Sequence, residues 1–230
     1  MCQKQNVEGF INRSLAMSNL YLVMNDYNEN ERFLKGVFDV VKTYPVKESK
    51  YYFPYYLEDE NCPDDVFLNL EEDKEISFDY RKEQGHIFSS NLWELMSKFR
   101  MPEKYIKNLS ISCCGESIAS DKTYKYVFFP PHDFIDYKES MLLDVTRGSL
   151  VPNKIIFKNS SLNDYDVFQL SSKIVIGLRL VINEDVKLSI ENNGFTGFKI
   201  VPLEQALAEY CKDYSFDPNR VLKKVKAKLP

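Results

Sequence analysis

The chain has 230 residues, 44% of them hydrophobic, and includes 16 Phe and 15 Tyr, so it can bury a core and is not globally disordered. It has only 8 Gly, which excludes collagen-like and low-complexity designs. The formal net charge of −4 argues against a general nucleic-acid-binding protein, whose surface would be basic.

The chain begins with a polar segment, residues 1–18, that we predict to be a loosely ordered extension, and the first strand is predicted at residues 19–24. The extension holds no apolar run of signal-peptide length. The most apolar stretch, residues 174–182, is far shorter than the roughly 20 residues of a membrane span and carries Arg179. We therefore expect a cytoplasmic protein with no membrane partner.

Acidic residues gather in one segment that follows an aromatic one. Residues 51–57 are rich in Tyr, and residues 58–79 hold ten acidic residues against one lysine. Such a segment is either a solvated face or a docking surface for a basic protein. If it is a docking surface, the candidate partner-binding residues are Tyr55, Tyr56, Glu58, Asp59, Asp64, Asp65, Glu71 and Glu72.

The first clear helix is predicted at residues 91–99, where apolar residues recur on one face. Residues 89–91 offer capping side chains, and Asn91 with Glu94 has the spacing of a capping box. Residues 105–113 then alternate between apolar and polar, as a half-buried strand does.

The second half of the chain is predicted to consist mostly of strands. These strands are expected at residues 123–129, 154–158, 165–170 and 198–203. A helix is predicted at residues 184–192, with Asn183 as its N-cap and Gly194 as the left-handed residue after it. Two further helices are predicted at residues 203–212 and, in a basic tail, at residues 218–228.

These elements indicate an α+β protein with mixed or antiparallel sheets and a few short helices packed against them. Residues 87–113 and 181–203 share one order of elements, a capped helix followed by a strand, which fits either a diverged duplication or two unrelated units. We predict an N-terminal α+β lobe at residues 19–115 and a C-terminal α+β lobe at residues 116–230. A duplication would make them related lobes.

No sequence motif assembles a catalytic, cofactor or metal site, so none is expected. The chain has two His, and neither lies at metal-ligand spacing from a Cys or from the other His. His132 beside Asp133 and Asp136 could act as a general base oriented by a carboxylate, but a turn after a strand, where His and Asp hydrogen-bond locally, is the favoured interpretation. The five Cys are expected to be free thiols, with Cys113 and Cys114 in the core.

The segment at residues 127–140 resembles a region of an immunity-protein family found in bacterial polymorphic-toxin systems. Asp136 and Ser140 match an aspartate and a serine that this family tends to carry there. Residues 195–198, Phe-Thr-Gly-Phe, match a family segment near the C-terminus.

The helix that opens at residues 89–92 also resembles a family feature, so the similarity covers roughly residues 86–203. Asn183 stands where the family usually has a serine at a helix start, a difference that preserves capping. The resemblance implies a non-enzymatic partner that neutralises a cognate toxin by direct contact, and it transfers no binding residue. The toxin would be basic if the acidic segment is its docking surface.

Two other functions remain open from the sequence. One is a small enzyme that uses the His132, Asp133 and Asp136 cluster or a thiol. The other is a regulatory protein-interaction module that docks through its basic C-terminal helix.

Overall fold

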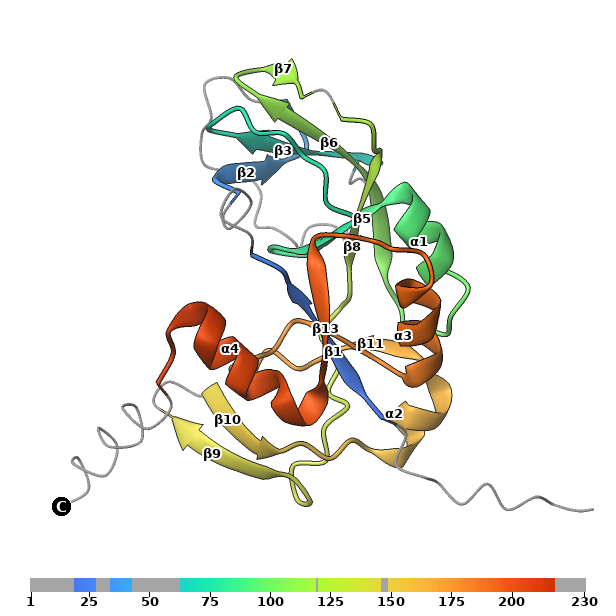
Figure 1. The fold of residues 1–230 in the computed structure, drawn as a ribbon, viewed down its shortest axis with the longest axis vertical. Helices are drawn as coiled ribbons and strands as arrows, with labels where there is room; N and C mark the ends of the chain where they lie inside the picture. The colour runs from blue at the N-terminus through green and yellow to red at the C-terminus, as the bar shows by residue number, and fades with distance from the viewer. Residues whose placement is uncertain (1–18, 28–33, 43–62, 119, 146–148, 218–230) are drawn as a thin grey trace, which may run out of the picture.

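The computed structural model describes residues 19–27, 34–42, 63–118, 120–145 and 149–217 (Figure 1). This part of the chain consists mostly of strands, in antiparallel or mixed sheets, with four short helices. The predicted α+β class is therefore confirmed. The predicted extension at 1–18, the aromatic segment at 51–57 and the tail helix at 218–228 lie outside the described residues.

A seven-stranded sheet forms the upper part of the molecule in Figure 1. Its strand order is β2-β3-β6-β8-β5-β4, with β7 paired to β6, and all pairs are antiparallel except β3 with β6. The strands are β2 (Gly36–Asp39), β3 (Asp65–Leu70), β4 (Tyr80–Lys82), β5 (His86–Ser89), β6 (Tyr105–Cys113), β7 (Glu116–Ser117) and β8 (Tyr124–Phe128).

A four-stranded antiparallel sheet lies below it, in the order β11-β12-β1-β13. Its strands are β1 (Tyr21–Asn25), β11 (Val167–Gln169), β12 (Leu180–Ile182) and β13 (Phe198–Pro202). All five residues of β1 are buried, as expected of a central strand covered on both faces. A separate hairpin is formed by β9 (Met141–Val145) and β10 (Ser149–Lys154).

Four helices cover these sheets, and their ends follow local capping chemistry. They are α1 (Ser90–Met96), α2 (Asn159–Asp164), α3 (Glu184–Glu191) and α4 (Ala206–Tyr214), the last preceded by a 3-10 turn at Leu203–Gln205. Ser89 caps α1 by accepting from the Leu92 amide at 3.3 Å, so the predicted capping box of Asn91 and Glu94 is wrong. The predicted cap Asn183 is confirmed, since its Oδ1 accepts from the Val186 amide at 3.1 Å.

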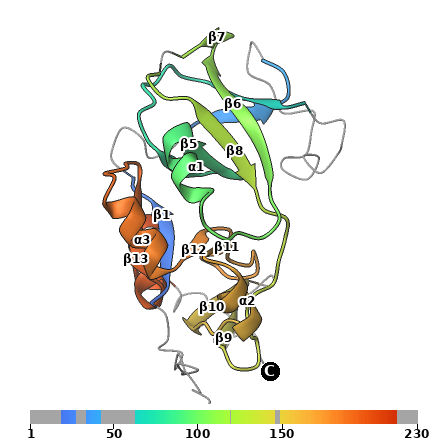
Figure 2. The same ribbon diagram turned by 90° about the vertical axis from the view of Figure 1, so that its right-hand side faces the viewer.

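The two helix–strand units seen in the sequence share one connectivity. Strands β5 and β6 flank β8 and are joined through α1, while β12 and β13 flank β1 and are joined through α3. In each unit two parallel strands thus enclose one antiparallel strand. The two helices contact each other at the junction of the sheets (Figures 1 and 2).

The two sheets do not follow the order of the sequence. Strand β1 lies among strands from the second half of the chain, and β8 lies among strands from the first half. One hydrophobic core cluster fills the space where the two sheets and helices α1 and α3 meet. The division into lobes at residue 115 stays a prediction.

A fully buried histidine joins the two sheets. His86 on β5 lies 2.8 Å through Nδ1 from the Tyr80 hydroxyl and 2.8 Å through Nε2 from Oε1 of Gln169 on β11. Because the Gln169 oxygen can only accept, the ring carries its hydrogen on Nε2, and the Tyr80 hydroxyl donates to Nδ1. Burial, with the nearby positive charge of Lys82, lowers the pKa of His86 to about 3.

This buried histidine makes stability depend on pH in a defined window. In the unfolded chain His86 takes up a proton near pH 6.5, whereas the folded protein resists protonation down to about pH 3. We therefore expect the free energy of unfolding to fall by about 2 kcal/mol between pH 7 and pH 5. Urea unfolding at each pH measures this loss.

The matched variants are His86→Gln and His132→Gln, which replace the only two histidines of the chain. His86→Gln should flatten the dependence between pH 7 and 5, and His132→Gln should leave it intact because that side chain is exposed. An equal slope in wild type and His86→Gln would contradict the assignment.

Candidate functional site

The candidate acidic surface is divided by strand β3. Asp64 and Asp65 lie at its start, Glu71 and Glu72 follow its end, and all four are exposed. At about 3.3 Å per residue, a six-residue strand separates the two pairs by roughly 20 Å. The other candidates, Tyr55, Tyr56, Glu58 and Asp59, lie outside the described residues.

Each acidic pair has a basic neighbour. Asp64 lies 3.7 Å from Lys107, and Glu72 lies 3.7 Å from Lys35. Lys35 and Glu72 are both exposed, so their ion pair contributes little to stability and Glu72 can exchange its lysine for a partner's cation at low cost. Asp64 is exposed too, but its partner Lys107 is largely covered. The role of these carboxylates in binding stays a prediction.

Asp79, the last residue of the acidic segment, has a different role because its side chain is buried between the sheets. Its Oδ1 accepts from the Ser89 hydroxyl at 2.7 Å, and its Oδ2 accepts from the Thr196 amide at 2.9 Å and from Lys122 Nζ at 2.9 Å. Burial opposes ionisation, but these hydrogen bonds outweigh it and hold the pKa of Asp79 below its ordinary value. Asp79 therefore joins β4, the cap of α1 and the segment before β13.

The Phe-Thr-Gly-Phe segment at residues 195–198 is structural. Gly197 has φ +91°, and a Cβ placed on it would lie 2.3 Å from the Cβ of Phe78. Thr196 exchanges hydrogen bonds with Asp79, whose amide donates to the Thr196 carbonyl at 2.8 Å. The motif thus needs glycine at 197 so that its backbone can lie close to Phe78, and threonine at 196 to hydrogen-bond Asp79.

The predicted cluster around His132 is not brought together as a catalytic group. His132 is exposed and borders a hollow of about 250 Å³, where its ring lies 5.5 Å from that of Phe134. Among the described residues, no hydrogen bond or ion pair joins it to Asp133 or Asp136. Asp133 instead pairs with Lys173 at 3.5 Å.

Asp136 and Ser140, the other residues that carry the resemblance, stabilise a turn. Asp136 Oδ1 accepts from the amides of Lys138 at 3.0 Å and Glu139 at 3.3 Å. The Ser140 hydroxyl donates to the Ile156 carbonyl at 3.2 Å and accepts from the Ile156 amide at 2.9 Å. The turn interpretation is confirmed for Asp136.

The adjacent cysteines differ from the prediction. Cys113 ends β6 half-buried, and Cys114 is exposed with φ +52°, so the expected burial in the core is wrong for Cys114. The left-handed conformation of Cys114 turns the chain back toward β7, and the sulfur atoms of Cys113 and Cys114 lie 3.7 Å apart. Cys113, Cys114 and Cys211 are free thiols; Cys2 and Cys62 lie outside the described residues.

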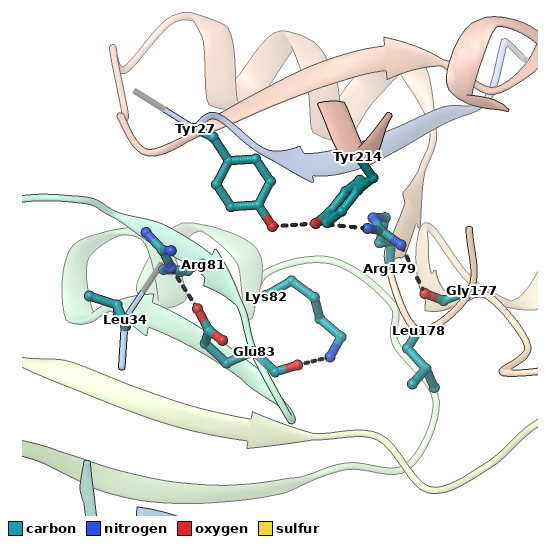
Figure 3. A pocket seen from close by; sticks show the side chains of 9 residues that line it. All are labelled: Tyr27, Leu34, Arg81, Lys82, Glu83, Gly177, Leu178, Arg179 and Tyr214. Atoms are coloured by element: carbon teal, nitrogen blue, oxygen red, sulfur yellow. Dashed lines mark hydrogen bonds and ion pairs between the residues drawn. The ribbon is translucent and has the colours of Figure 1, made fainter. Parts of the chain in front are cut away.

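A cleft of about 290 Å³ lies where the two sheets meet (Figure 3). Its wall contains Arg81, Lys82 and Glu83 from β4 and the residue after it, Arg179 before β12, and Tyr214 at the end of α4. The sequence contains one signal of this site, since Arg179 is a charged residue inside an apolar run.

Strand β4 is fixed at this cleft by a side chain from the other sheet. Asn25, the buried last residue of β1, accepts from the Lys82 amide at 2.7 Å and donates to the Lys82 carbonyl at 2.9 Å. The Asn25 side-chain amide therefore makes the two hydrogen bonds to the Lys82 backbone that a neighbouring strand would otherwise make, and it links β4 to the other sheet. The Lys82 backbone is held on both sides, which fixes where its side chain enters the cleft.

The described residues contain neither a membrane-spanning helix nor a cluster of metal-ligating side chains. None of their helices is long and apolar enough to cross a membrane. In the same residues, no group of three or more His, Cys, Asp or Glu side chains is placed to hold a metal ion.

These features define an α+β protein whose buried polar clusters connect two sheets and whose positively charged cleft lies between them. The model of the family Immunity protein 43 (Imm43) matches residues 13–218, most of the chain, and the chain therefore belongs to this family. The resemblance to an immunity-protein family is thus confirmed. A search of the curated proteins found no match.

Proposed function

We propose that the protein neutralises a cognate bacterial toxin by direct contact, as a binding protein and not as an enzyme. Its membership of the Immunity protein 43 family carries this proposal and supports an immunity role in general. The geometry agrees with it, since Asp133 pairs with Lys173, Asp136 caps a turn, and no hydrogen bond or ion pair in the described residues joins either carboxylate to His132.

Co-expression with the toxin encoded beside this gene tests the proposal. Cells that make the toxin alone should stop growing, and cells that also make this protein should grow. Purified together, the two proteins should co-elute as one complex in gel filtration. Growth arrest in the presence of this protein, or protection without a complex, would overturn neutralisation by direct contact.

The exposed acidic residues beside β3 are the proposed docking surface for a basic toxin. Because two pairs lie at opposite ends of the strand, each pair is tested alone, as Asp64→Lys with Asp65→Lys and as Glu71→Lys with Glu72→Lys. Reversal of the pair that faces the toxin should lower the association rate constant about tenfold at low salt, because the electrostatic steering of the basic toxin is lost. It should also weaken the salt dependence of that rate.

Stopped-flow association with labelled toxin measures both effects. The control reverses Glu103 and Glu139, two exposed acids elsewhere on the molecule, and should leave the rate unchanged. If neither acidic pair alters the rate while co-expression still protects, the surface is wrong and the immunity role stands.

A further inference from the structure

We propose that the cleft between the two sheets binds a single oxyanion, a phosphate or carboxylate group, between Lys82 and Arg179. This site is separate from the acidic surface and goes beyond the proposed function, since an anion would bind whether or not a toxin is present. The charge balance of the cleft, the way its two cations are held, and its size support such a site.

Charge balance in the cleft is incomplete. Arg81 is almost fully buried, with 3% of its side chain exposed, and is neutralised by Glu83, whose Oε1 lies 2.6 Å from its Nε. Lys82 and Arg179 make no ion pair with any carboxylate of the described residues. Two positive charges therefore border one small space, as Figure 3 shows, and repel each other until an anion neutralises them.

Both cations also keep unused hydrogen-bond donors. Lys82 Nζ donates to the Glu83 carbonyl, which leaves two of its three N–H groups without an acceptor in the described structure. Arg179 donates through Nη1 to the Gly177 carbonyl and through Nη2 to the Tyr214 hydroxyl, each at 3.3 Å, which leaves three of its five. An oxyanion supplies several acceptor lone pairs to such donors, and its charge strengthens each bond.

Arg179 is fixed in place before any ligand arrives. Its guanidinium carbon lies 5.0 Å from the ring centre of Tyr210 and 5.6 Å from that of Tyr214. The preceding turn is tight, because a Cβ on Gly177 would lie 2.1 Å from the Ser171 carbonyl oxygen and Leu178 has φ +60°. A cation that is already ordered loses little entropy on binding, which favours an anion site over a mobile surface arginine.

Lys82 adds a proton-linked response. Burial, together with the positive charge of Arg179, lowers the pKa of its ammonium group to about 8. The other groups that face it are Arg81 and Glu83 on its own segment, His86 from β5, and Tyr27 and Tyr214 across the cleft. His86 is neutral, and burial raises the pKa of Tyr214 to about 12, so these two groups keep their charge between pH 7 and 9.5 while Lys82 loses its proton.

The volume limits the ligand. A cleft of about 290 Å³ is at the lower end of small-molecule sites, so it suits one acidic group with a few attached atoms and not a large cofactor. Two sources fit this chemistry. One is an acidic side chain of a protein partner, and the other is a free phosphate-bearing small molecule.

Isothermal titration with sulfate, which does not change charge between pH 7 and 9.5, tests the site in the isolated protein. Wild type should bind one sulfate, and Lys82→Gln and Arg179→Gln should each weaken it about tenfold, because each removes charge-assisted hydrogen bonds. Lys98→Gln, at an exposed lysine that follows α1 and does not line the cleft, should bind as wild type does. Absent saturable binding, or binding unchanged in both cleft variants, would overturn the proposal.

The pH dependence separates a built site from general attraction to positive charge. Sulfate affinity of wild type should fall by about tenfold or more from pH 7 to pH 9.5, as Lys82 loses its proton. Lys82→Arg keeps the charge, so it should bind sulfate with affinity independent of pH in this range. This conservative variant also serves if Lys82→Gln does not fold. A wild-type affinity that stays flat would overturn the role of Lys82.

Competition identifies the source of the anion. Inorganic phosphate and N-acetylaspartate methylamide are each titrated against bound sulfate, and displacement by one of them supports the site and names its chemistry. Displacement by neither would overturn the proposal. If saturating sulfate also slows toxin association at constant ionic strength, the group that occupies the cleft is a carboxylate of the toxin. If the protein binds sulfate but does not protect cells, the anion site stands and the immunity role is refuted.

Discussion

Replacing Gly197 by alanine should lower the free energy of unfolding by about 3–5 kcal/mol. The residue has φ +91°, where a side chain costs about 1–3 kcal/mol, and the added Cβ would lie 2.3 Å from the Cβ of Phe78 and 3.0 Å from the Tyr80 carbonyl oxygen. Tyr80 begins β4 and Phe78 lies just before it, so the clash separates β4 from the segment before β13. Urea unfolding followed by circular dichroism measures the loss.

Gly194 provides a matched control three residues away. It also has positive φ, +64°, but nothing lies within 4 Å of the position its Cβ would take. Gly194→Ala should therefore cost only about 1 kcal/mol, the price of the left-handed conformation alone. Equal losses in the two variants would show that the close approach at Gly197 contributes nothing.

Replacing Asp79 by alanine should cost about 3 kcal/mol. The change leaves the buried Ser89 hydroxyl and the Thr196 amide without an acceptor and removes the partner of Lys122. Glu75→Ala, at an exposed acid of the same acidic segment, should change stability by less than about 0.5 kcal/mol. The same unfolding measurement compares them.

Acid titration distinguishes Asp79 from His86. The folded-state pKa of Asp79 is lowered, so its contribution is present above the unfolded pKa near 3.8 and is lost as pH falls through the folded value. Asp79→Ala should thus flatten the stability curve below about pH 4 and leave the loss between pH 7 and 5 unchanged. A change in the higher window would mean that the two networks are coupled.

Local patterns predicted the elements whose burial follows their own sequence. Strand β6 was predicted with its observed bounds, Tyr105–Cys113, because its residues alternate between core and solvent. Helix α3 was predicted with its cap, because Asn183 and the first-turn acids act within one turn of chain.

Elements whose own residues lack a clear pattern were not predicted. The strand expected at residues 154–158 is wrong: β10 ends at Lys154, and Phe157 forms only an isolated bridge with Ile135. The hairpin of β9 and β10 was missed because Pro152 lies within it and its strand residues Met141 and Leu143 are exposed. The apolar run at 174–182 makes a turn at Gly177 before β12 begins, because its residues pack around that turn.

The cleft could not be predicted from the sequence, since its residues come from five segments that only the tertiary fold brings together. The charge pattern instead drew attention to residues 58–79. That segment proves to contain a buried structural residue, Asp79, and two exposed pairs divided by β3. A count of charges along a chain does not reveal which of them a strand separates.

The central position of β1 has a consequence for the timing of synthesis. This strand leaves the ribosome early, yet its two neighbours, β12 and β13, are among the last elements to be made. Its apolar residues, such as Leu22 and Met24, must wait in the nascent chain without their sheet, and contacts between such distant segments form slowly. The four-stranded sheet therefore cannot form strand by strand during synthesis, because β1 has no neighbour to pair with until β12 and β13 have been made.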